Sequence, residues 1–372
     1  MGGSTKPALA KATGLSVPAV HKMAASLVDV GLLYETGEEI SSGHGRKGRV
    51  IGLNPTFRTA IGIEITDLSI TGIVLDFAGQ VHQEQVIGLS SLQPNHVLAT
   101  VIRMIQDLQE AARELGPIAG VGIGTHGIAE KGRITRFPGN PDWEPLAITS
   151  LVQEATGLPC RLDLRIYAAT VSELRFGRRY GFPGPIFYFN SGPGNGFATG
   201  IIIHDQVLRG ANGLQGQFHH LHMDPQGERC YCGSFGCLGT LTSPQAIQQQ
   251  AQEALTQTGV DSALRGLPTV DFSSILAAAH KHDKLARHLI EDACTWLGIG
   301  FSHVINLLNP SLIVIGGAYA EGGEMILHAI QRSAYRYSES HLLQNLQWSL
   351  STLNHNAAAT GAATLLFDRY FQ

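Results

Sequence analysis

The residues whose types and spacing best suit chemistry in this sequence are three cysteines that follow a group of histidines. Four side chains form the pattern His-x9-Cys-x-Cys-x4-Cys: His220, Cys230, Cys232 and Cys237. Thiolate and imidazole ligands within eighteen residues favour a tetrahedral zinc ion. By spacing alone, His219 and His222 are alternative ligands. The competing interpretation is three free cysteines packed beside a surface histidine.

Four protein ligands leave no position for water, so such a zinc ion is structural rather than catalytic. Glycines at positions 233 and 236 supply the turns that close the loop. The other two cysteines, Cys160 and Cys294, stand alone. This distribution fits a metal site in a reducing compartment better than a framework of disulfides.

The chain around this loop is long enough for two or three cores. It has 372 residues, 44% of them hydrophobic, and single domains usually stop growing at about 250 residues. Its longest apolar runs are far shorter than the roughly 20 residues that span a bilayer. No basic and apolar leader precedes a cleavage site. We therefore expect a cytoplasmic protein with more than one domain.

Positive charge is concentrated at the start of the chain. The net charge is −4, yet residues 1–50 hold six basic and four acidic residues. A helix is predicted over residues 7–14, ended by a glycine, and Ser16 is a good N-cap for a second helix with apolar positions spaced through residues 20–28. The order helix, glycine turn, helix is typical of the helix-turn-helix. Residues 32–34 and 39–40 could pair as a small wing.

The beginning of the second helix is expected to enter the major groove of DNA. A flexible basic strip over residues 42–49 suits phosphates or a narrow minor groove. The predicted DNA-binding residues are Ser16, Pro18, Ala19, His21, Lys22, Arg46, Lys47 and Arg49. The alternatives are an ordinary helical hairpin followed by a solvated linker.

Beyond residue 57 the chain twice shows three strands followed by alternating helices and strands. The predicted strands of the first copy are 60–65, 70–76, 81–87, 119–123 and 159–162; those of the second include 186–189, 197–203, 206–209 and 311–315. Helices are predicted near 96–115, 145–156, 286–308 and 323–337. Such a duplication predicts two α/β lobes facing a ligand cleft. A last helix near 357–369 is expected to fold back on the first lobe.

These features together resemble the ROK family of repressors and sugar kinases. The resemblance rests on Thr13-Gly14-Leu15-Ser16, on Gly31-Leu32-Leu33 and on the segment from Gly216 to Gly239, and it covers essentially the whole chain. It implies the actin-like, ribonuclease H-like two-lobed ATPase fold preceded by a winged helix-turn-helix, as in sugar-responsive repressors of the xylose and N-acetylglucosamine type. It also places the histidine ligand of zinc at His220.

The implied domains are a winged helix over residues 1–52, a first lobe over 53–163 plus 355–372, and a second lobe with the zinc loop over 164–354. The chain departs from the family in one respect here. The family has another helix ahead of this winged helix, where only Met1 to Thr5 stand in this sequence. We therefore expect a winged helix trimmed at its N-terminus.

The resemblance also implies where a sugar kinase would hold phosphate and its catalytic base. The family's first phosphate loop, Asp-x-Gly-Gly-Thr, corresponds here to residues 64–68, which read Glu-Ile-Thr-Asp-Leu. The catalytic Asn-Asp pair corresponds to Leu164 and Arg165, and an arginine cannot act as a base near neutral pH. Gln217 and Gly239 replace two sugar-binding glutamates. We therefore expect no kinase activity.

Several polar residues could still bind an effector: Asn140, Asp142, Arg165, Gln217 and His220. Arg165 would favour an anionic sugar derivative, because a guanidinium forks onto carboxylate or phosphate. The alternative is that Arg165 pairs with an acid such as Asp163 or Glu173 and binds no ligand.

The leading hypothesis is a zinc-containing repressor, a homodimer or homotetramer, that binds operator DNA and a carbohydrate-derived effector. One rival is a sugar kinase with atypical catalytic residues. Another is a protein of the same fold that no longer binds DNA.

Overall fold

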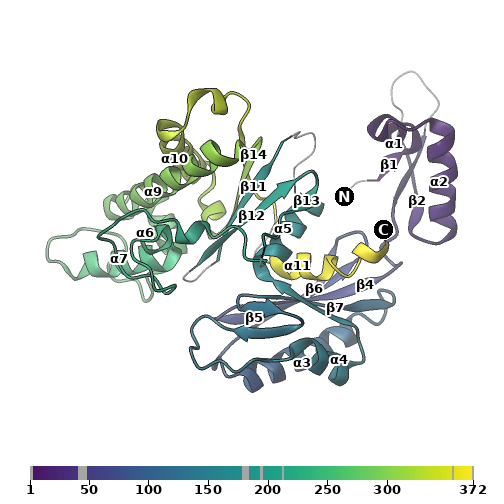
Figure 1. The fold of residues 1–372 in the computed structure, drawn as a ribbon, viewed down its shortest axis with the longest axis horizontal. Coiled ribbons are helices and arrows are strands. Elements are labelled where there is room, and N and C mark those ends of the chain that lie inside the picture. Colours follow the sequence, from purple (N-terminus) through teal and green to yellow (C-terminus); the bar gives the residue numbers. More distant parts are fainter. Residues whose placement is uncertain are drawn as a thin grey trace. The chain divides into compact units, whose positions relative to one another are not determined.

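The computed structural model describes residues 3–40, 48–177, 184–192, 196–211, 213–353 and 356–370. The chain divides into two compact units (Figure 1), one formed by Met1–Ala168 with Ala358–Gln372 and the other by Ala169–Ala357. Within the described residues, no helix is both long and apolar enough to cross a membrane.

The first unit begins with two short helices and a small sheet. Helix α1 (Lys6–Thr13) ends at Gly14, whose φ of 70° is left-handed, and α2 (Val17–Asp29) begins after Ser16. The Ser16 hydroxyl oxygen accepts from the backbone N–H of Ala19 at 3.3 Å. Strands β1 (Ser4–Thr5), β3 (Gly48–Leu53) and β2 (Leu33–Ile40) form an antiparallel sheet in that order. The predicted order of helix, glycine turn and helix is therefore present, with a small antiparallel sheet beside it.

The predicted pairing within the wing is wrong. Residues 32–34 and 39–40 were expected to pair with each other, but residues 33–40 form one strand that pairs with β3. Gly37, with a φ of 81°, lies where the register shifts between Glu35 and Glu39. It therefore makes an irregularity within an extended strand rather than a hairpin turn.

The two units contain sheets of the same topology. The first has the order β10-β7-β4-β5-β6 and the second β13-β12-β11-β14-β15. In each, three antiparallel strands from consecutive segments are extended by two parallel strands. The first sheet is formed by β4 (Thr59–Ile65), β5 (Ser69–Asp76), β6 (Val81–Gly88), β7 (Ile118–Thr125) and β10 (Cys160–Leu164). The second is formed by β11 (Ile186–Ser191), β12 (Phe197–Ile203), β13 (Gln206–Val207), β14 (Leu312–Gly317) and β15 (Gln347–Leu350). The duplication predicted from the sequence is confirmed.

Helices cover both faces of the first sheet, which explains why β4 is buried along its whole length. Helices α3 (Pro94–Ala111) and α4 (Ile148–Thr156) share one core with the isoleucines of β4 and β7. Helix α11 (Ala357–Thr364) packs on the other face with Ala60, Ile73 and Leu75 (Figure 1). The chain end therefore folds back on the first lobe, as predicted. A short hairpin of β8 (Ile128–Glu130) and β9 (Arg133–Arg136) completes the unit.

The second unit has its core on one long helix. Helix α9 (Lys284–Leu308) is capped by Asp283, which accepts from the Ala286 N–H at 2.9 Å, and ends at Asn309 in the left-handed conformation. It packs among α6 (Leu238–Thr242), α7 (Pro244–Thr256), α8 (Phe272–His280) and α10 (Gly323–Tyr337). Helix α5 (Arg165–Phe176) connects the two units. The sequence did not predict α7 and α8, whose glutamines and alanines give a weak apolar pattern.

The close packing of α11 on the sheet generates a prediction. A Cβ at Gly122 would lie 1.9 Å from the Ala362 carbonyl oxygen, closer than any contact allows. We expect Gly122→Ala to lower the free energy of unfolding by about 3 kcal/mol, because neither backbone can give way easily. Gly88→Ala, on β6, meets nothing within 4 Å and is the matched control. Denaturant unfolding of both variants tests this, and equal stability would show that α11 can move off the sheet.

Candidate metal centre and ligand-binding residues

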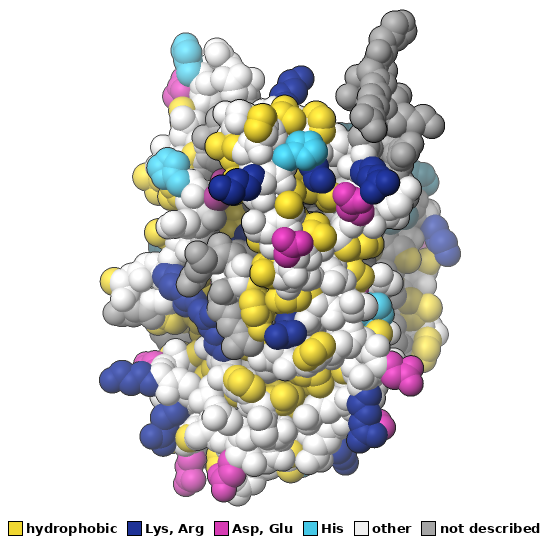
Figure 2. Space-filling model, turned by 90° about the vertical axis from the view of Figure 1, so that its right-hand side faces the viewer, with side chains coloured by type: hydrophobic (Ala, Val, Ile, Leu, Met, Phe, Trp, Pro, Cys, Tyr) yellow, Lys and Arg dark blue, Asp and Glu magenta, His cyan; other side chains and the backbone are white. Residues whose placement is uncertain are grey.

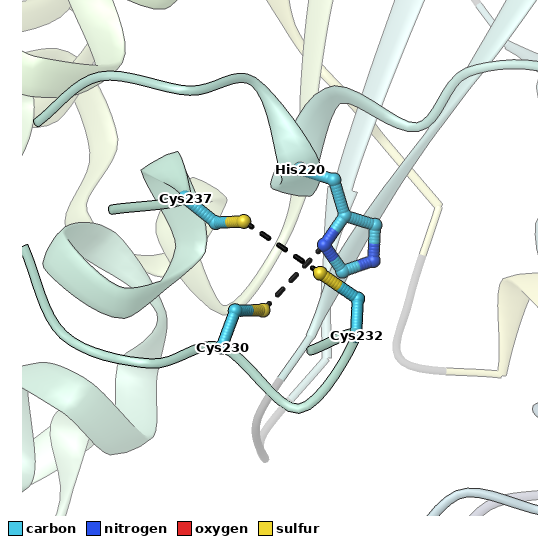
Figure 3. A group of neighbouring side chains, drawn as sticks. All are labelled: His220, Cys230, Cys232 and Cys237. Atoms are coloured by element: carbon cyan, nitrogen blue, oxygen red, sulfur yellow. Dashed lines mark hydrogen bonds between the residues drawn. The ribbon is translucent and has the colours of Figure 1, made fainter. Parts of the chain in front are cut away.

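The structure brings together the four predicted metal ligands in the second unit (Figure 3). The ligand atoms of His220, Cys230, Cys232 and Cys237 all lie within 4.8 Å of one another. His220 Nδ1 is 3.6 Å from Cys230 Sγ, and Cys232 Sγ is 3.8 Å from Cys237 Sγ. At a zinc–sulfur distance of about 2.3 Å, tetrahedral ligands stand about 3.8 Å apart for two sulfurs and about 3.6 Å apart for sulfur and nitrogen. The residues therefore fit a tetrahedral metal ion.

Backbone turns hold the ligands in place. His220 closes a short 3-10 helix, η1 (Phe218–His220), and Cys237 immediately precedes α6. The Cys230 N–H donates to the Ser234 carbonyl at 2.8 Å, and the Gly233 N–H donates back to Cys230 at 2.9 Å. Gly236, with a φ of 61°, lies so close to the Asp224 carbonyl that a Cβ would overlap it. Backbone hydrogen bonds and close packing therefore fix the conformation of the loop, and in this conformation the three thiols lie close together.

The pKa shifts of the three thiols differ, since that of Cys232 is lowered by hydrogen bonds from the Ser234 backbone and from the neighbouring thiols. Burial and the two neighbouring thiols raise the pKa of Cys237 to about 12, and burial raises the pKa of Cys230. These thiols would thus carry protons unless a cation stabilised the thiolates. Burial lowers the pKa of His220, which keeps the imidazole neutral as a ligand must be.

The two alternative histidines lie elsewhere. His222 Nδ1 is 2.9 Å from the Phe235 carbonyl oxygen, a contact that uses this nitrogen outside the cluster. The ring of His219 lies over Gly239, where a Cβ would be 1.9 Å from its Cε1 atom. This second contact could not be predicted, because nothing in the spacing of residues 219 and 239 relates them.

A second cluster lies in the first unit, at the carboxyl ends of three parallel strands. Ile65, Thr125 and Leu164 stand in register on β4, β7 and β10. Arg165 follows directly, and its Nε donates to Glu64 Oε1. Both side chains are largely buried, with 14% of the arginine and 6% of the glutamate exposed. Ligands of α/β sheets bind at this edge, but here a guanidinium and a carboxylate already neutralise each other.

The pairing bears on the expected role of Arg165. Asp163 and Glu173 were named above as possible partners of Arg165, and the structure shows a pair with Glu64. Glu173 accepts from the Ser351 hydroxyl at 2.7 Å, and burial raises the pKa of its carboxyl. The partner could not be found from local spacing, because Glu64 is 101 positions away.

Two further side chains extend this cluster. His126 Nδ1 lies 3.5 Å from Asp67 Oδ1. The hydrogen bond to His126, with the positive charges of His126 and Arg165, lowers the pKa of Asp67 against the opposing effect of burial. A second carboxylate is therefore held ionised where a kinase of this fold would hold phosphate, and it would repel such an anion.

The remaining predicted effector residues belong to local turns. The Asn140 side chain donates to the Leu92 carbonyl at 3.0 Å and accepts from the Asp142 N–H at 3.1 Å. Asp142 and Gln217 are exposed, and Gln217 donates to the Leu214 carbonyl at 3.3 Å. Asn140, Asp142 and Arg165 lie in the first unit, whereas Gln217 and His220 lie in the second.

Five of the predicted DNA-binding residues lie at the start of α2, and four of these five are exposed. Ser16, Pro18, His21 and Lys22 are exposed and Ala19 is half-buried. On β3, the exposed Arg49 donates to Glu35 at 2.8 Å. Arg46 and Lys47 lie outside the described residues. Met23 and Leu27, expected on the packed face of α2, are 55% and 38% exposed. Figure 2 shows hydrophobic side chains among charged ones on the face that carries α2.

The fold defines an α/β protein of two units built on the same sheet, in which two short helices and a small sheet precede the first unit's large sheet. Residues 60–369 match the ROK family. The chain belongs to this family, and the resemblance inferred from the sequence is confirmed.

Named relatives match almost the whole chain. The xylose repressor of Caldicellulosiruptor bescii is 28% identical over 370 residues, which are 97% of this chain and 90% of that protein. The DNA-binding transcriptional dual regulator NagC of Escherichia coli K12 is 27% identical over 355 residues, 94% of this chain and 85% of that protein.

Solved structures share the fold. A ROK family transcriptional regulator, a homologue of the E. coli MLC protein, superposes with a TM-score of 0.79 and 26% identity, covering 99% of this chain and 92% of that one. A ROK family glucokinase from Streptomyces griseus, in complex with glucose and AMPPNP, gives a TM-score of 0.72 and 25% identity, covering 82% of this chain and 98% of that one. The predicted fold class is confirmed.

The buried ion pair generates a prediction. Glu64→Gln removes the negative charge beside the buried guanidinium of Arg165, so we expect a loss of about 3–5 kcal/mol in the free energy of unfolding. Glu110→Gln is the control, because Glu110 forms an exposed pair with Arg113 in the same unit, which should be worth less than about 1 kcal/mol. Denaturant unfolding measures both. Similar small losses would mean that water reaches Arg165.

Proposed function

We propose that this protein is a sugar-responsive transcriptional repressor whose winged helix binds operator DNA and whose two-lobed body binds a carbohydrate-derived effector. The observation that carries the proposal is the extent of the likeness. The repressors and the regulator match 94% to 99% of the chain, whereas the glucokinase structure covers 82% of it. The likeness to regulators thus reaches beyond the sugar-kinase body.

We propose that the body is not a kinase. Transfer of phosphate to a sugar needs a base for the hydroxyl proton and a loop that accepts phosphate. The family's base corresponds to Arg165, which is paired with Glu64, and the acidic Asp67 stands in the phosphate loop. Asn140, Asp142, Arg165, Gln217 and His220 remain the proposed effector contacts. Because Glu64 neutralises Arg165, an anionic effector gains less from this arginine than the sequence suggested.

The proposal that the body is not a kinase can be tested separately. We expect no sugar-dependent ATP turnover above background with glucose, xylose or N-acetylglucosamine, since removal of the base alone costs roughly 10² to 10⁴ in rate. A coupled assay that follows ADP release measures this. Turnover that disappears in Arg165→Ala would establish a kinase with atypical residues.

We propose that different residues of the winged helix contact bases and phosphates. The exposed start of α2 offers Pro18, Ala19 and His21 to base edges, and the Ser16 hydroxyl still has its proton to donate to a phosphate after capping α2. Arg49 is already paired with Glu35, which would compete with a phosphate for its guanidinium. Lys22 and the basic residues of the wing would then supply most of the affinity, and two copies would occupy two half-sites.

The test of the proposal is a selection of genomic DNA fragments by the full-length protein. We expect enrichment of a palindrome with half-sites separated by about one helical turn or a multiple of it, and release of this DNA by the effector. Recovery of no enriched palindrome at moderate salt, from folded and metal-loaded protein, would leave the interpretation of a ROK-fold protein that does not bind DNA.

Salt dependence separates phosphate contacts from base contacts. Lys22→Gln should weaken binding to all sequences and flatten the slope of log affinity against log salt by about 0.9, because one phosphate contact is lost. Lys284→Gln, at the start of α9 in the second unit, is the matched control. An unchanged slope for Lys22→Gln would remove this residue from the interface.

We propose that the metal is a structural zinc ion and that the protein acts in the cytoplasm, where operator DNA and a reducing environment are found. The bound ion would hold the loop closed between η1 and α6. His220, Cys230, Cys232 and Cys237 would be its ligands, with no water among them.

Elemental analysis should therefore find about one zinc per chain. Cys232→Ser should lose zinc and lower the melting temperature by several degrees, because metal binding is coupled to folding of the loop. Cys160→Ser, a cysteine of the first unit outside the cluster, should retain the metal. Less than about half an equivalent of zinc in the unaltered protein, or full zinc in Cys232→Ser, contradicts this ligand set.

A further inference from the structure

The three cysteines of the metal cluster differ in their exposure. Cys230 and Cys237 are buried, with 3% and 1% of their surface exposed, whereas Cys232 is exposed. Cys232 lies on a turn, residues 231–235, that is exposed throughout. All the cysteines of the chain fall within the described residues, and Cys232 is the exposed one among them. A reagent dissolved in water therefore meets the sulfur of Cys232 first.

The surroundings of Cys232 leave it room to shift, whereas Cys237 is held in place. A Cβ at Gly233, the residue after Cys232, would meet nothing within 4 Å. Cys237 immediately precedes α6, and the N–H of Leu238 donates to the Leu221 carbonyl at 2.7 Å. Rotation of the exposed Cys232 side chain can therefore bring its sulfur closer to that of Cys237 without displacing packed atoms.

The distance between these two sulfurs suits a reaction between them. Cys232 Sγ lies 3.8 Å from Cys237 Sγ (Figure 3), and a disulfide requires an approach to about 2.05 Å. Cys230 is the other neighbouring thiol, but only one residue separates it from Cys232, and a disulfide that closes so short a loop departs from the preferred geometry. Its sulfur also faces His220 Nδ1, at 3.6 Å. The geometry therefore favours Cys237 as the partner of Cys232.

The form of cysteine that binds a metal is also the form that attacks a peroxide. Both reactions use the thiolate. Cysteines that respond to peroxide are typically exposed thiolates with a second thiol nearby, which reacts with the first oxidation product. Cys232 and Cys237 combine these properties in the metal-loaded protein. Cys160 is half-buried and Cys294 is buried, and each stands alone in the sequence.

We propose that Cys232 is a peroxide-sensitive thiol whose oxidation forms a disulfide with Cys237 and releases the metal ion. The Cys232 thiolate attacks one oxygen of hydrogen peroxide, the O–O bond breaks, and hydroxide leaves, which gives a sulfenic acid on Cys232. The Cys237 thiolate then attacks the Cys232 sulfur, the S–O bond breaks, and a second hydroxide leaves. The two sulfurs together lose the two electrons that reduce the peroxide.

The disulfide would remove two of the four metal ligands. His220 and Cys230 would remain, which are too few for a structural zinc site. His220 closes η1 and Cys237 precedes α6, so loss of the ion would release the link between these two elements. The inference rests on the proposed metal site and goes beyond it, because it makes the conformation of the second unit depend on the oxidation state of its surroundings.

The test is treatment of the full-length, zinc-loaded protein with hydrogen peroxide. A chromogenic chelator follows released zinc, and alkylation with mass spectrometry maps the remaining thiols. We expect the thiols of Cys232 and Cys237 to disappear as about one zinc per chain is released, and a disulfide to link the two residues. Dithiothreitol with added zinc should restore the metal content, because a thiol reduces a disulfide but not the higher oxidation states of cysteine.

Cys232→His removes the exposed thiol and keeps a metal ligand. Imidazole is a common zinc ligand, position 232 is exposed, and a histidine cannot form a sulfenic acid. We expect this variant to retain zinc and to release it to peroxide about tenfold more slowly or less. Cys160→Ser leaves the cluster intact and is the matched control, which should release zinc at the rate of the unaltered protein.

The unaltered protein carries the test if Cys232→His does not bind zinc, through the order in which its thiols disappear. Oxidation of Cys230 before Cys232 overturns the proposal, as does zinc that stays bound after Cys232 and Cys237 are oxidised. Resistance of all three thiols to millimolar peroxide, or equal rates of release from Cys232→His and the unaltered protein, also overturns it. Absence of zinc before treatment contradicts the metal site instead, and mapping the disulfide in that protein still tests the pairing of Cys232 with Cys237.

Discussion

The first unit depends on the contact between α11 and the glycines of its central strands. The helix lies so close to β4 and β7 that its carbonyl oxygens occupy the positions that side chains at Gly62 and Gly122 would need. On this face the sheet is covered by a segment that follows the second unit in the sequence. As a result the whole second unit lies, in the sequence, between two segments of the first. Gly361 of α11 is also in contact with the carbonyl of Ala168, the last residue before the second unit.

The two units carry the same sheet but use its edge differently. In the first, two close pairs lie at the carboxyl ends of the parallel strands, Glu64 with Arg165 and Asp67 with His126. In the second unit, the candidate metal ligands lie in the loop between β13 and α6, where their ligand atoms are close together. The same fold can therefore support catalysis in sugar kinases and effector binding in a regulator.

Much of the fold could be predicted from the sequence because its elements have strong local patterns. The strands β4, β5 and β7 are apolar runs between turn residues, and α9 has an N-cap, a long apolar period and an asparagine at its end. The metal cluster was predictable because all four ligands fall within one short segment. The fold class follows from these elements together with the resemblance to a known family.

The errors and omissions have physical causes. The wing was mispredicted because Gly37 makes a bulge where a turn was expected. The partner of Arg165 could not be found because Glu64 comes from a distant strand. Met23 and Leu27 were expected to be packed, but helical spacing alone does not show whether another segment covers a given face. The contact between the ring of His219 and Gly239 is a tertiary contact, and the sequence around neither residue indicates it.

That last contact has a consequence for substitutions at position 239. A glutamate at position 239, which the resemblance implies for the sugar kinases, is incompatible with the imidazole of His219 in its present position. An acidic side chain at position 239 therefore requires the His219 ring to move or position 219 to change as well. The two positions are coupled, although they are far apart in the sequence.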